Sequence, residues 1–416
     1  MGRMPAPQAH PPPHTASSMN HGASAPLPLA GLRVLDLSRV LAGPMCAMAL
    51  ADLGADVIKI EHPERGDDTR DWGVRIGTHN TSYFNSANRN KRSITLDLQG
   101  EAGLAIARRL AAQSDVVIEN FKPGGADRLG LGYEELSAAN PRLVYCSISG
   151  YARTTAEARR PGYDLVVQGE AGIMAMNGEE GQGPLKFGVA AVDMFTGMYA
   201  GQAILAALYE RQRTGRGRHV QMALYDCGVM ITSYYGMEAL LRAGDPPKFG
   251  NAHPAIVPYG VFDAADGPIV MTVGNNGQFA RLCRDVLGQP EWATDERFAT
   301  NTARSAHRAE LLPLVRQALQ AFGRRELLAR LEQAQIPCGE VLGMHEALTS
   351  ERTGAAGLLH HYEDTESGTQ SVLAPPYMMD GQRLPVRRQP PHLGEHTDEI
   401  LRELQSLEKA AGAPRP

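Results

Sequence analysis

The stretch RVLDLSRVLAGPMCAMALADLGADVIKIE, residues 33–61, decides the fold class of this 416-residue chain. It opens with a short apolar strand over residues 33–37, and Pro44 then starts an apolar helix that Gly54 ends. A second strand follows at once, over residues 57–61. Strand, helix and strand in this order form a βαβ unit, in which the two strands run parallel. The stretch therefore predicts an α/β sheet.

The same alternation continues downstream. Residues 93–97, 116–119 and 143–147 are apolar and strand-like, and helical spacing is present over residues 101–113 and 134–139. Strands that alternate with helices predict a Rossmann-like, doubly wound parallel sheet. In such a sheet we expect ligands to bind at the carboxyl ends of the strands.

The usual ligand of a doubly wound sheet is a dinucleotide, but its sequence signature is missing. Residues 38–44, SRVLAGP, stand where G-x-G-x-x-G would follow the first strand. The chain also lacks G-x-x-x-x-G-K-[ST], H-E-x-x-H and G-x-S-x-G. The sequence therefore shows none of the usual signatures of NAD binding, ATP use, zinc proteolysis or serine hydrolase chemistry.

The composition is that of an ordinary soluble globular protein, with 43% apolar and 21% charged residues. No apolar run reaches the roughly 20 residues that a membrane span needs, so no membrane partner is expected. The formal charge of -5 argues against a nucleic-acid surface. The five cysteines are scattered and form no C-x-x-C pair, which favours a reducing, cytoplasmic location and predicts no metal site.

One carboxylate, Asp193, stands alone in KFGVAAVDMFTGMYAG, residues 186–201. The residues after it, 194–211, carry apolar side chains at helical spacing and few charges, which predicts a buried helix with Asp193 at its N-terminus. Asp is a preferred N-cap residue, and capping alone would explain its presence. The rest of the chain offers a second explanation.

Several short motifs occur in order along the chain: VLAGP at 40–44, LGADVIKIE at 53–61, GDDTR at 66–70, NRNKRS at 88–93, VIENF at 117–121 and RTGRG at 213–217. Together they resemble the family III CoA-transferases, the group of formyl-CoA and carnitine CoA-transferases. The resemblance runs from about residue 31 to about residue 404. The segment around Asp193 is similar to the one that carries the family's aspartate nucleophile.

The resemblance implies covalent catalysis by a carboxylate. Asp193 would attack the thioester of a donor acyl-CoA to give a mixed anhydride, and CoA would then attack Asp193 to leave an aspartyl-CoA thioester. The acceptor acid would repeat these steps in reverse order. An Asp with an ordinary pKa of about 3.9 is ionised at neutral pH and needs no neighbouring base. CoA thioesters are then substrates, and no metal, ATP or tightly bound cofactor is expected.

The family's contacts to CoA fall at strand ends in this sequence. Phe121 could instead pack in the core, and Arg128 could be a solvated helix charge. His62 stands where some relatives carry an arginine, and a neutral imidazole would weaken a contact to the CoA phosphate or ribose. The matching positions are Val40, Leu41, Leu96, Asp97, Leu98, Gln99, Asn120, Phe121, Lys122, Arg128 and Tyr163.

Two other functions stay open. The α-methylacyl-CoA racemases share the fold, and they need a second acid/base group, a histidine in an A-G-H-D segment. Here the segment ends in Tyr163-Asp164, and tyrosine, with a pKa near 10, is a poor base at pH 7. Transfer is therefore favoured over racemisation. The second alternative is an inactive CoA-binding regulator, against which the retained Asp193 argues.

Some segments are similar to succinyl-CoA-dependent dicarboxylate CoA-transferases of the glutarate and hydroxymethylglutarate type. A dicarboxylate acceptor needs a cation for its distal carboxylate, and Arg70 and Arg89 are candidates, although each could equally form an ion pair. Asp164 and His253 are further candidates for the substrate site. His253 lies in a loop, where a histidine is often merely exposed.

At this length two domains are expected. The large Rossmann-like domain covers residues 29–246, and a hairpin followed by helical stretches predicts a smaller α+β domain over residues 247–370. By resemblance, residues 371–408 return to the large domain, and the protein forms an interlocked homodimer. Residues 1–28, rich in Pro, Ala and Ser, are expected to be a disordered tail, and residues 409–416 a C-terminal tail.

Overall fold

The computed structural model describes residues 26–412. The tail predicted for residues 1–28 therefore lies almost wholly outside the described residues, and so does the end of the tail predicted for residues 409–416.

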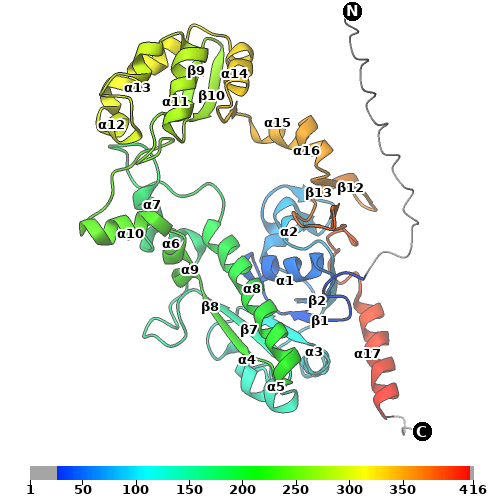
Figure 1. Cartoon of the computed structure of the whole chain (residues 1–416). Helices are drawn as coiled ribbons and strands as arrows, with labels where there is room; N and C mark the ends of the chain where they lie inside the picture. The colour runs from blue at the N-terminus through cyan, green and yellow to red at the C-terminus, as the bar shows by residue number, and fades with distance from the viewer. Residues whose placement is uncertain (1–25, 413–416) are drawn as a thin grey trace, which may run out of the picture.

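A parallel sheet forms the centre of the molecule (Figure 1). Within the described residues it has six strands in the order β5-β2-β1-β6-β7-β8, and every neighbouring pair is parallel. Counted along the chain this order is 3-2-1-4-5-6, the doubly wound arrangement, in which the winding reverses between β1 and β6. The strands are β1 (Arg33–Asp36), β2 (Asp56–Glu61), β5 (Lys91–Thr95), β6 (Val116–Glu119), β7 (Val144–Ser149) and β8 (His219–Ala223).

The sequence analysis predicted five of these strands and the α/β class, and the structure confirms them. It missed β8, which is an edge strand. Only one of its five residues, Ala223, is buried, so it lacks the continuous apolar run that marks the inner strands.

Helices cover both faces of the sheet (Figure 1). One core cluster joins α1 (Ala42–Asp52) and α8 (Ala191–Thr214) to Val34 and its neighbours on one face. On the other face, Leu35 and its neighbours pack against α3 (Glu101–Ala112), α5 (Tyr133–Ala139) and α17 (Thr397–Gly412). Successive residues of β1 thus serve opposite faces, as a pleated strand requires.

Helix α8 is long and apolar enough, by length and composition alone, to cross a membrane. Half of the relevant window is buried inside the protein, where the helix packs against α1, β7 and β8. This is the packing of a core helix of a doubly wound domain.

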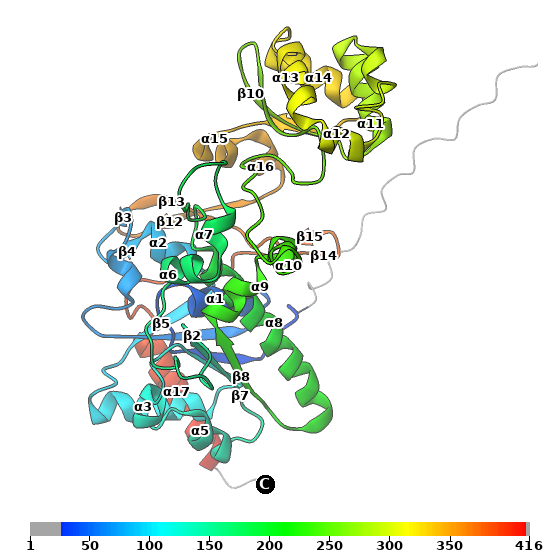
Figure 2. The ribbon, with the colours of Figure 1, turned by 90° about the vertical axis from the view of Figure 1, so that its left-hand side faces the viewer.

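A second lobe lies apart from the parallel sheet (Figures 1 and 2). Its antiparallel sheet is formed by β9 (Tyr259–Ala264), β10 (Gly267–Thr272) and β11 (Cys338–Glu340), and its core contains Phe262, Phe279 and Phe298. Two connections join it to the rest, one through α10 (Ser233–Arg242) and one through α15 (Met344–Thr349) and α16 (Glu351–Ala355). Its helices are α11 (Asn276–Arg281), a π-helical turn η2 (Leu282–Leu287), η3 (Pro290–Ala293), α12 (Asn301–Ala306), α13 (Arg308–Leu319) and α14 (Arg324–Gln333).

The chain returns to the large domain earlier than residue 371. Strands β12 (Leu359–Asp364) and β13 (Gly368–Leu373) form a hairpin, and Asn85 Nδ2 donates a hydrogen bond to the Tyr362 hydroxyl at 3.2 Å. The remaining elements are η1 (Asp68–Asp71), β3 (Arg75–Ile76), β4 (Asn80–Thr81), α2 (Ser82–Ser86), α4 (Gly125–Arg128), α6 (Asp164–Glu170), α7 (Ile173–Met176), α9 (Leu224–Met230), β14 (Met378–Met379) and β15 (Gln382–Arg383).

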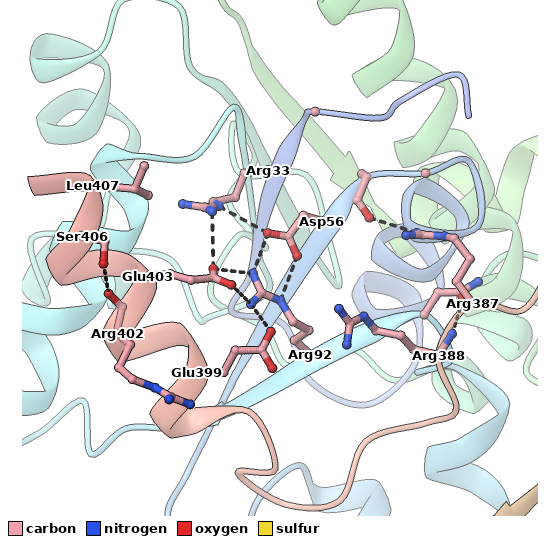
Figure 3. A pocket seen from close by; sticks show the side chains of 14 residues that line it. Arg33, Asp56, Arg92, Arg387, Arg388, Glu399, Arg402, Glu403, Ser406 and Leu407 are labelled. Carbon is pink, nitrogen blue, oxygen red and sulfur yellow. Dashed lines mark hydrogen bonds and ion pairs between the residues drawn. The ribbon is translucent and has the colours of Figure 1, made fainter. Parts of the chain in front are cut away.

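An ion cluster fastens α17 to the amino edge of the sheet, in the wall of a cavity of about 750 Å³ (Figure 3). Arg92 donates two hydrogen bonds to the Asp56 carboxylate, at 2.9 and 2.7 Å. The same guanidinium pairs with Glu399 at 2.8 Å and with Glu403 at 2.9 Å, both on α17. The last helix of the chain is therefore tied to two of its first three sheet strands.

Candidate active site

Asp193 lies in the first turn of α8, buried and only 9% exposed. The residue before the helix is Ala190, whose methyl group cannot accept a hydrogen bond. Asp193 is thus inside the helix, and the interpretation of this residue as an N-cap is wrong.

A glycine brings the N-terminal turns of α1 and α8 together beside Asp193. A Cβ atom on Gly197, one helical turn after Asp193, would lie 2.7 Å from the carbonyl oxygen of Ala42 and 3.1 Å from Met45 Cβ. Only a residue without a side chain allows this approach. The first turn of α1 therefore packs against α8 one helical turn after Asp193.

Asp164, at the start of α6, supplies the acceptor that α8 lacks. Its Oδ1 accepts hydrogen bonds from the backbone N–H groups of Val192 at 2.8 Å and Asp193 at 3.3 Å. The side chain of Gln168 then donates to Asp164 Oδ2 at 2.7 Å and accepts from the N–H of Phe187 at 2.7 Å. These contacts fix both the helix that carries Asp193 and the segment before it.

The surroundings of Asp193 raise its pKa to about 7, first through burial and second through the negative charge of Asp164. The sequence analysis expected an ordinary, fully ionised carboxylate, and this expectation is wrong. Near neutral pH the unliganded carboxyl group is divided between its protonated and ionised forms.

Asp193 lines a cavity of about 380 Å³ at the carboxyl edge of the sheet. A second cavity of about 350 Å³ adjoins it and is lined by residues that follow β2 and β5. The two share Arg39, Asp68, Phe121, Gly125 and Arg128 in their walls, and the two together are called the groove below. Every predicted CoA contact lines this groove: Val40, Leu41, Asn120, Lys122 and Tyr163 in the first cavity, Leu96, Asp97, Leu98 and Gln99 in the second, and Phe121 and Arg128 in both.

Two of these residues have contacts that the sequence did not reveal. Asn120 binds the backbone of Arg39 twice, accepting from its N–H at 3.0 Å and donating to its carbonyl oxygen at 2.8 Å. Its amide therefore shapes the loop after β1. Tyr163 is 62% exposed, so its hydroxyl is not buried in the core and is accessible from the groove.

Arg70 and Arg89 lie outside the groove, and the prediction that they clamp a substrate carboxylate is wrong. Arg70, 2% exposed, donates to both oxygens of Glu61 at 2.7 Å. Arg89, 6% exposed, donates to Asp52, and neither residue lines either cavity. Each guanidinium is already neutralised by a buried carboxylate.

His253 is not brought to Asp193 within one chain. Its Nδ1 accepts a hydrogen bond from the N–H of Ala255 at 3.0 Å, and its ring lies near those of Tyr234 and Tyr259. It lines neither cavity of the groove.

Sequence reasoning missed four arginines in the groove wall, Arg39, Arg65, Arg159 and Arg160. Arg39 pairs with Asp68 at 3.3 Å. Among the described residues, the Arg159 side chain has no hydrogen bond or ion pair, and it lines the same cavity as Asp193. Its signal was the basic pair Arg159-Arg160 directly before the segment that was compared with racemases.

Comparison with known proteins points in one direction. A family model described as CoA-transferase family III matches residues 29–397. Succinate–glutarate CoA-transferase of Agrobacterium fabrum (strain C58) is 43% identical over 92% of the chain and 97% of that relative. Succinyl-CoA:glutarate CoA-transferase of Homo sapiens is 38% identical over 91% of the chain and 86% of the relative. A crystal structure of a CAIB/BAIF family protein from Brucella suis superposes with a TM-score of 0.81 at 43% identity, covering 91% of the chain and all of that protein.

Proposed function

Because the chain belongs to CoA-transferase family III, we propose that it transfers CoA from succinyl-CoA to glutarate or a closely related dicarboxylic acid. The observation that carries this proposal is the position of Asp193, in a groove whose wall is formed by the segments that match the family's CoA contacts.

In the proposed reaction the Asp193 carboxylate attacks the thioester carbonyl carbon of succinyl-CoA. The C–S bond breaks, CoA leaves as the thiolate, and a mixed anhydride remains. The thiolate then attacks the Asp193 acyl carbon, succinate leaves, and an aspartyl-CoA thioester results. Glutarate attacks this thioester through its carboxylate, and the released thiolate attacks the glutaryl carbon of the new anhydride to free Asp193. Each step exchanges one acyl bond for another, so no net oxidation or hydrolysis occurs.

The surroundings of Asp193 suit these charges. Each tetrahedral intermediate carries an oxyanion, and the positive ends of α1 and α8 stabilise negative charge at the point where the helices meet. Asp164 holds the first turn of α8 through two backbone N–H groups, which keeps the nucleophile in place. We assign the CoA phosphates to the cations along the groove, Arg65, Lys122 and Arg128.

We assign the distal carboxylate of the acceptor to Arg159, in place of Arg70 and Arg89. Its guanidinium is unpaired among the described residues and lines the cavity that contains Asp193. A charge-assisted pair of this kind contributes about 1.5 to 3 kcal/mol, which is roughly ten- to a hundredfold in specificity.

Arg159→Met separates this role from phosphate binding. Loss of the distal contact should reduce kcat/KM for glutarate by about ten- to a hundredfold while the value for butyrate changes little. A rise in the KM for succinyl-CoA with every acid alike would instead assign Arg159 to the CoA phosphates. Arg297→Met, in an exposed ion pair of the second lobe, is the control.

The overall proposal is tested by incubation with succinyl-CoA and a panel of carboxylic acids, followed by mass spectrometry of the products. Intact-protein mass spectrometry with succinyl-CoA alone should show a CoA adduct, and peptide mapping should locate it on the peptide that contains Asp193. The adduct should be absent from Asp193→Asn. Formation of glutaryl-CoA without any adduct would contradict the covalent route.

Racemisation is the weaker alternative because no histidine is among the residues that line the Asp193 cavity. The enzyme should therefore cause no exchange of the α-hydrogen of a 2-methylacyl-CoA in deuterated water. Exchange at a rate comparable to transfer would make racemase the better assignment.

We further propose a homodimer. Helix α10 buries none of its residues, and Leu240 and Leu241 are 76% and 85% exposed. An apolar cavity of about 890 Å³ adjoins this helix. This apolar face fits a second copy of the chain. Light scattering should give twice the chain mass, and the free cysteines fit a cytoplasmic location.

A further inference from the structure

The loop that follows β1 holds a residue in a backbone conformation that suits it poorly. Val40 has φ of 73°, in the left-handed region that β-branched residues rarely adopt. Strain of this kind persists only where the surroundings hold the residue in place, and it is concentrated at functional sites. Val40 lies in the wall of the cavity that contains Asp193.

The buried carboxylate of Asp67 fixes the backbone of Val40. Asp67, 1% exposed, accepts hydrogen bonds from the N–H of Val40 at 3.2 and 3.3 Å, one to each carboxylate oxygen. Its Oδ2 also pairs with Lys59 Nζ at 2.9 Å, and both side chains are fully inaccessible. The same Nζ donates to the carbonyl oxygen of Ser38 at 2.7 Å. One buried ion pair thus binds the loop at two points.

Asp67 is itself fixed. Its N–H donates to Glu61 Oε2 at 3.0 Å, and its Oδ1 accepts from both the N–H and the hydroxyl of Thr69, at 3.0 and 2.8 Å. It belongs to the wall of the second cavity but not of the cavity that contains Asp193, and its side chain is fully inaccessible. A role for Asp67 in the reaction must therefore act through the loop.

The left-handed turn at Val40 decides where α1 begins. The helix starts at Ala42, two residues later, and the carbonyl oxygen of Ala42 lies directly against Gly197 of α8. A right-handed or extended Val40 would send the chain in another direction and move the first turn of α1 away from Asp193.

We propose that Asp67 is a positioning residue, which with Lys59 holds Val40 left-handed and thereby sets the N-terminal turn of α1 beside the nucleophile. This inference rests on the proposed function only in taking Asp193 as the reacting group. The test exploits glycine, which adopts positive φ without strain.

Asp67→Asn should lower kcat by about tenfold or more, with a smaller change in the affinity for CoA measured by calorimetry. Adding Val40→Gly to Asp67→Asn should recover at least a third of the lost rate, because glycine no longer needs to be held. The control is Asp52→Asn, which breaks another buried ion pair, with Arg89, that does not touch the loop. That variant should lose thermal stability and keep its kcat below the melting temperature, and Val40→Gly should not improve it.

The proposal would be overturned if folded Asp67→Asn had an unchanged kcat. It would also be overturned if Val40→Gly restored none of the kcat that Asp67→Asn loses. If Asp67→Asn does not fold, Val40→Pro replaces it. Proline fixes φ near −65° and removes the N–H that donates to Asp67, so the left-handed conformation and its hydrogen bond are both lost while Asp67 and Lys59 keep their charges. Folded Val40→Pro should lose at least tenfold in kcat, and full activity would be decisive against the role. Failure of the proposed function would look different, as the absence of a CoA adduct in the unmodified protein.

Discussion

Buried charges have opposite surroundings at the two edges of the parallel sheet, the amino edge and the carboxyl edge, which are the two ends of its strands. At the amino edge, Arg92 is 4% exposed in its side chain and is surrounded by the carboxylates of Asp56, Glu399 and Glu403. At the carboxyl edge, Asp193 is also buried but has a second carboxylate, Asp164, as its charged neighbour. Within the described residues no cation forms an ion pair with Asp193. The paired charges at the amino edge favour stability. The unpaired, buried Asp193 at the carboxyl edge costs stability, as is common for groups in active sites.

Replacement of Asp193 gives the largest effect expected from this difference. Asp193→Asn should lower transfer by about a thousandfold or more, because an amide cannot form the anhydride or the thioester. Binding of CoA should be largely kept, since the groove residues are unchanged. Steady-state rates and calorimetry with CoA measure the two properties on one preparation. A variant that keeps more than a few per cent of the activity would remove Asp193 from the mechanism.

The same substitution should affect stability in the direction opposite to a change at the amino edge. The folded pKa of about 7 exceeds the unfolded value of 3.8, so ionisation of Asp193 costs native stability, and the cost grows as pH rises from about 4 to 7. Asp193→Asn should therefore raise the free energy of unfolding at pH 8 by up to about 4 kcal/mol, and by much less at pH 5.

Arg92→Met, in contrast, should lower the free energy of unfolding by about 2 kcal/mol, because it leaves three carboxylates without their shared partner. Urea titrations at one fixed protein concentration compare both variants at the two pH values. If both substitutions changed the free energy of unfolding in the same direction at pH 8, the proposed difference between the two edges would be wrong.

The pH dependence of activity gives a smaller and sharper test. In the proposed mechanism only ionised Asp193 attacks, so kcat/KM should rise about tenfold per pH unit below pH 7 and level off above it. Asp164→Asn keeps an oxygen for the N–H groups of Val192 and Asp193 but removes the neighbouring charge. Its profile should therefore be displaced to lower pH. A flat profile between pH 5 and 8 in the unmodified enzyme would show that the substrate, or another group, resets the ionisation of Asp193.

Local patterns in the sequence were enough to predict five of the six strands and the long helix. Periodicity marks a strand such as Val116–Glu119 without reference to distant parts of the chain. The resemblance placed Asp193 and the residues of the groove. Each of these features is determined by a short segment, so it can be recognised in the sequence without knowledge of contacts to distant residues.

Several of the errors concern partners that are distant in sequence. Arg89 reaches Asp52 across 37 residues, and the acceptor for the first turn of α8 comes from Asp164, 28 residues before Val192. The raised pKa of Asp193 has the same origin, because burial and a neighbouring carboxylate exist only after folding. An arginine in a motif therefore predicts a charge, but the folded chain decides whether that charge is free.

The last helix closes the first domain, and this has a consequence for the order of synthesis. Ile400 and Leu404 of α17 lie in the same core cluster as Leu35 of β1, and Glu403 binds Arg92 of β5. A ribosome adds roughly 5 to 20 residues per second, so the sheet waits for its final helix until the whole second lobe has been made. During that interval the nascent chain exposes an apolar face of the sheet. We therefore expect chaperones that bind exposed apolar surfaces to bind this chain while it is being synthesised.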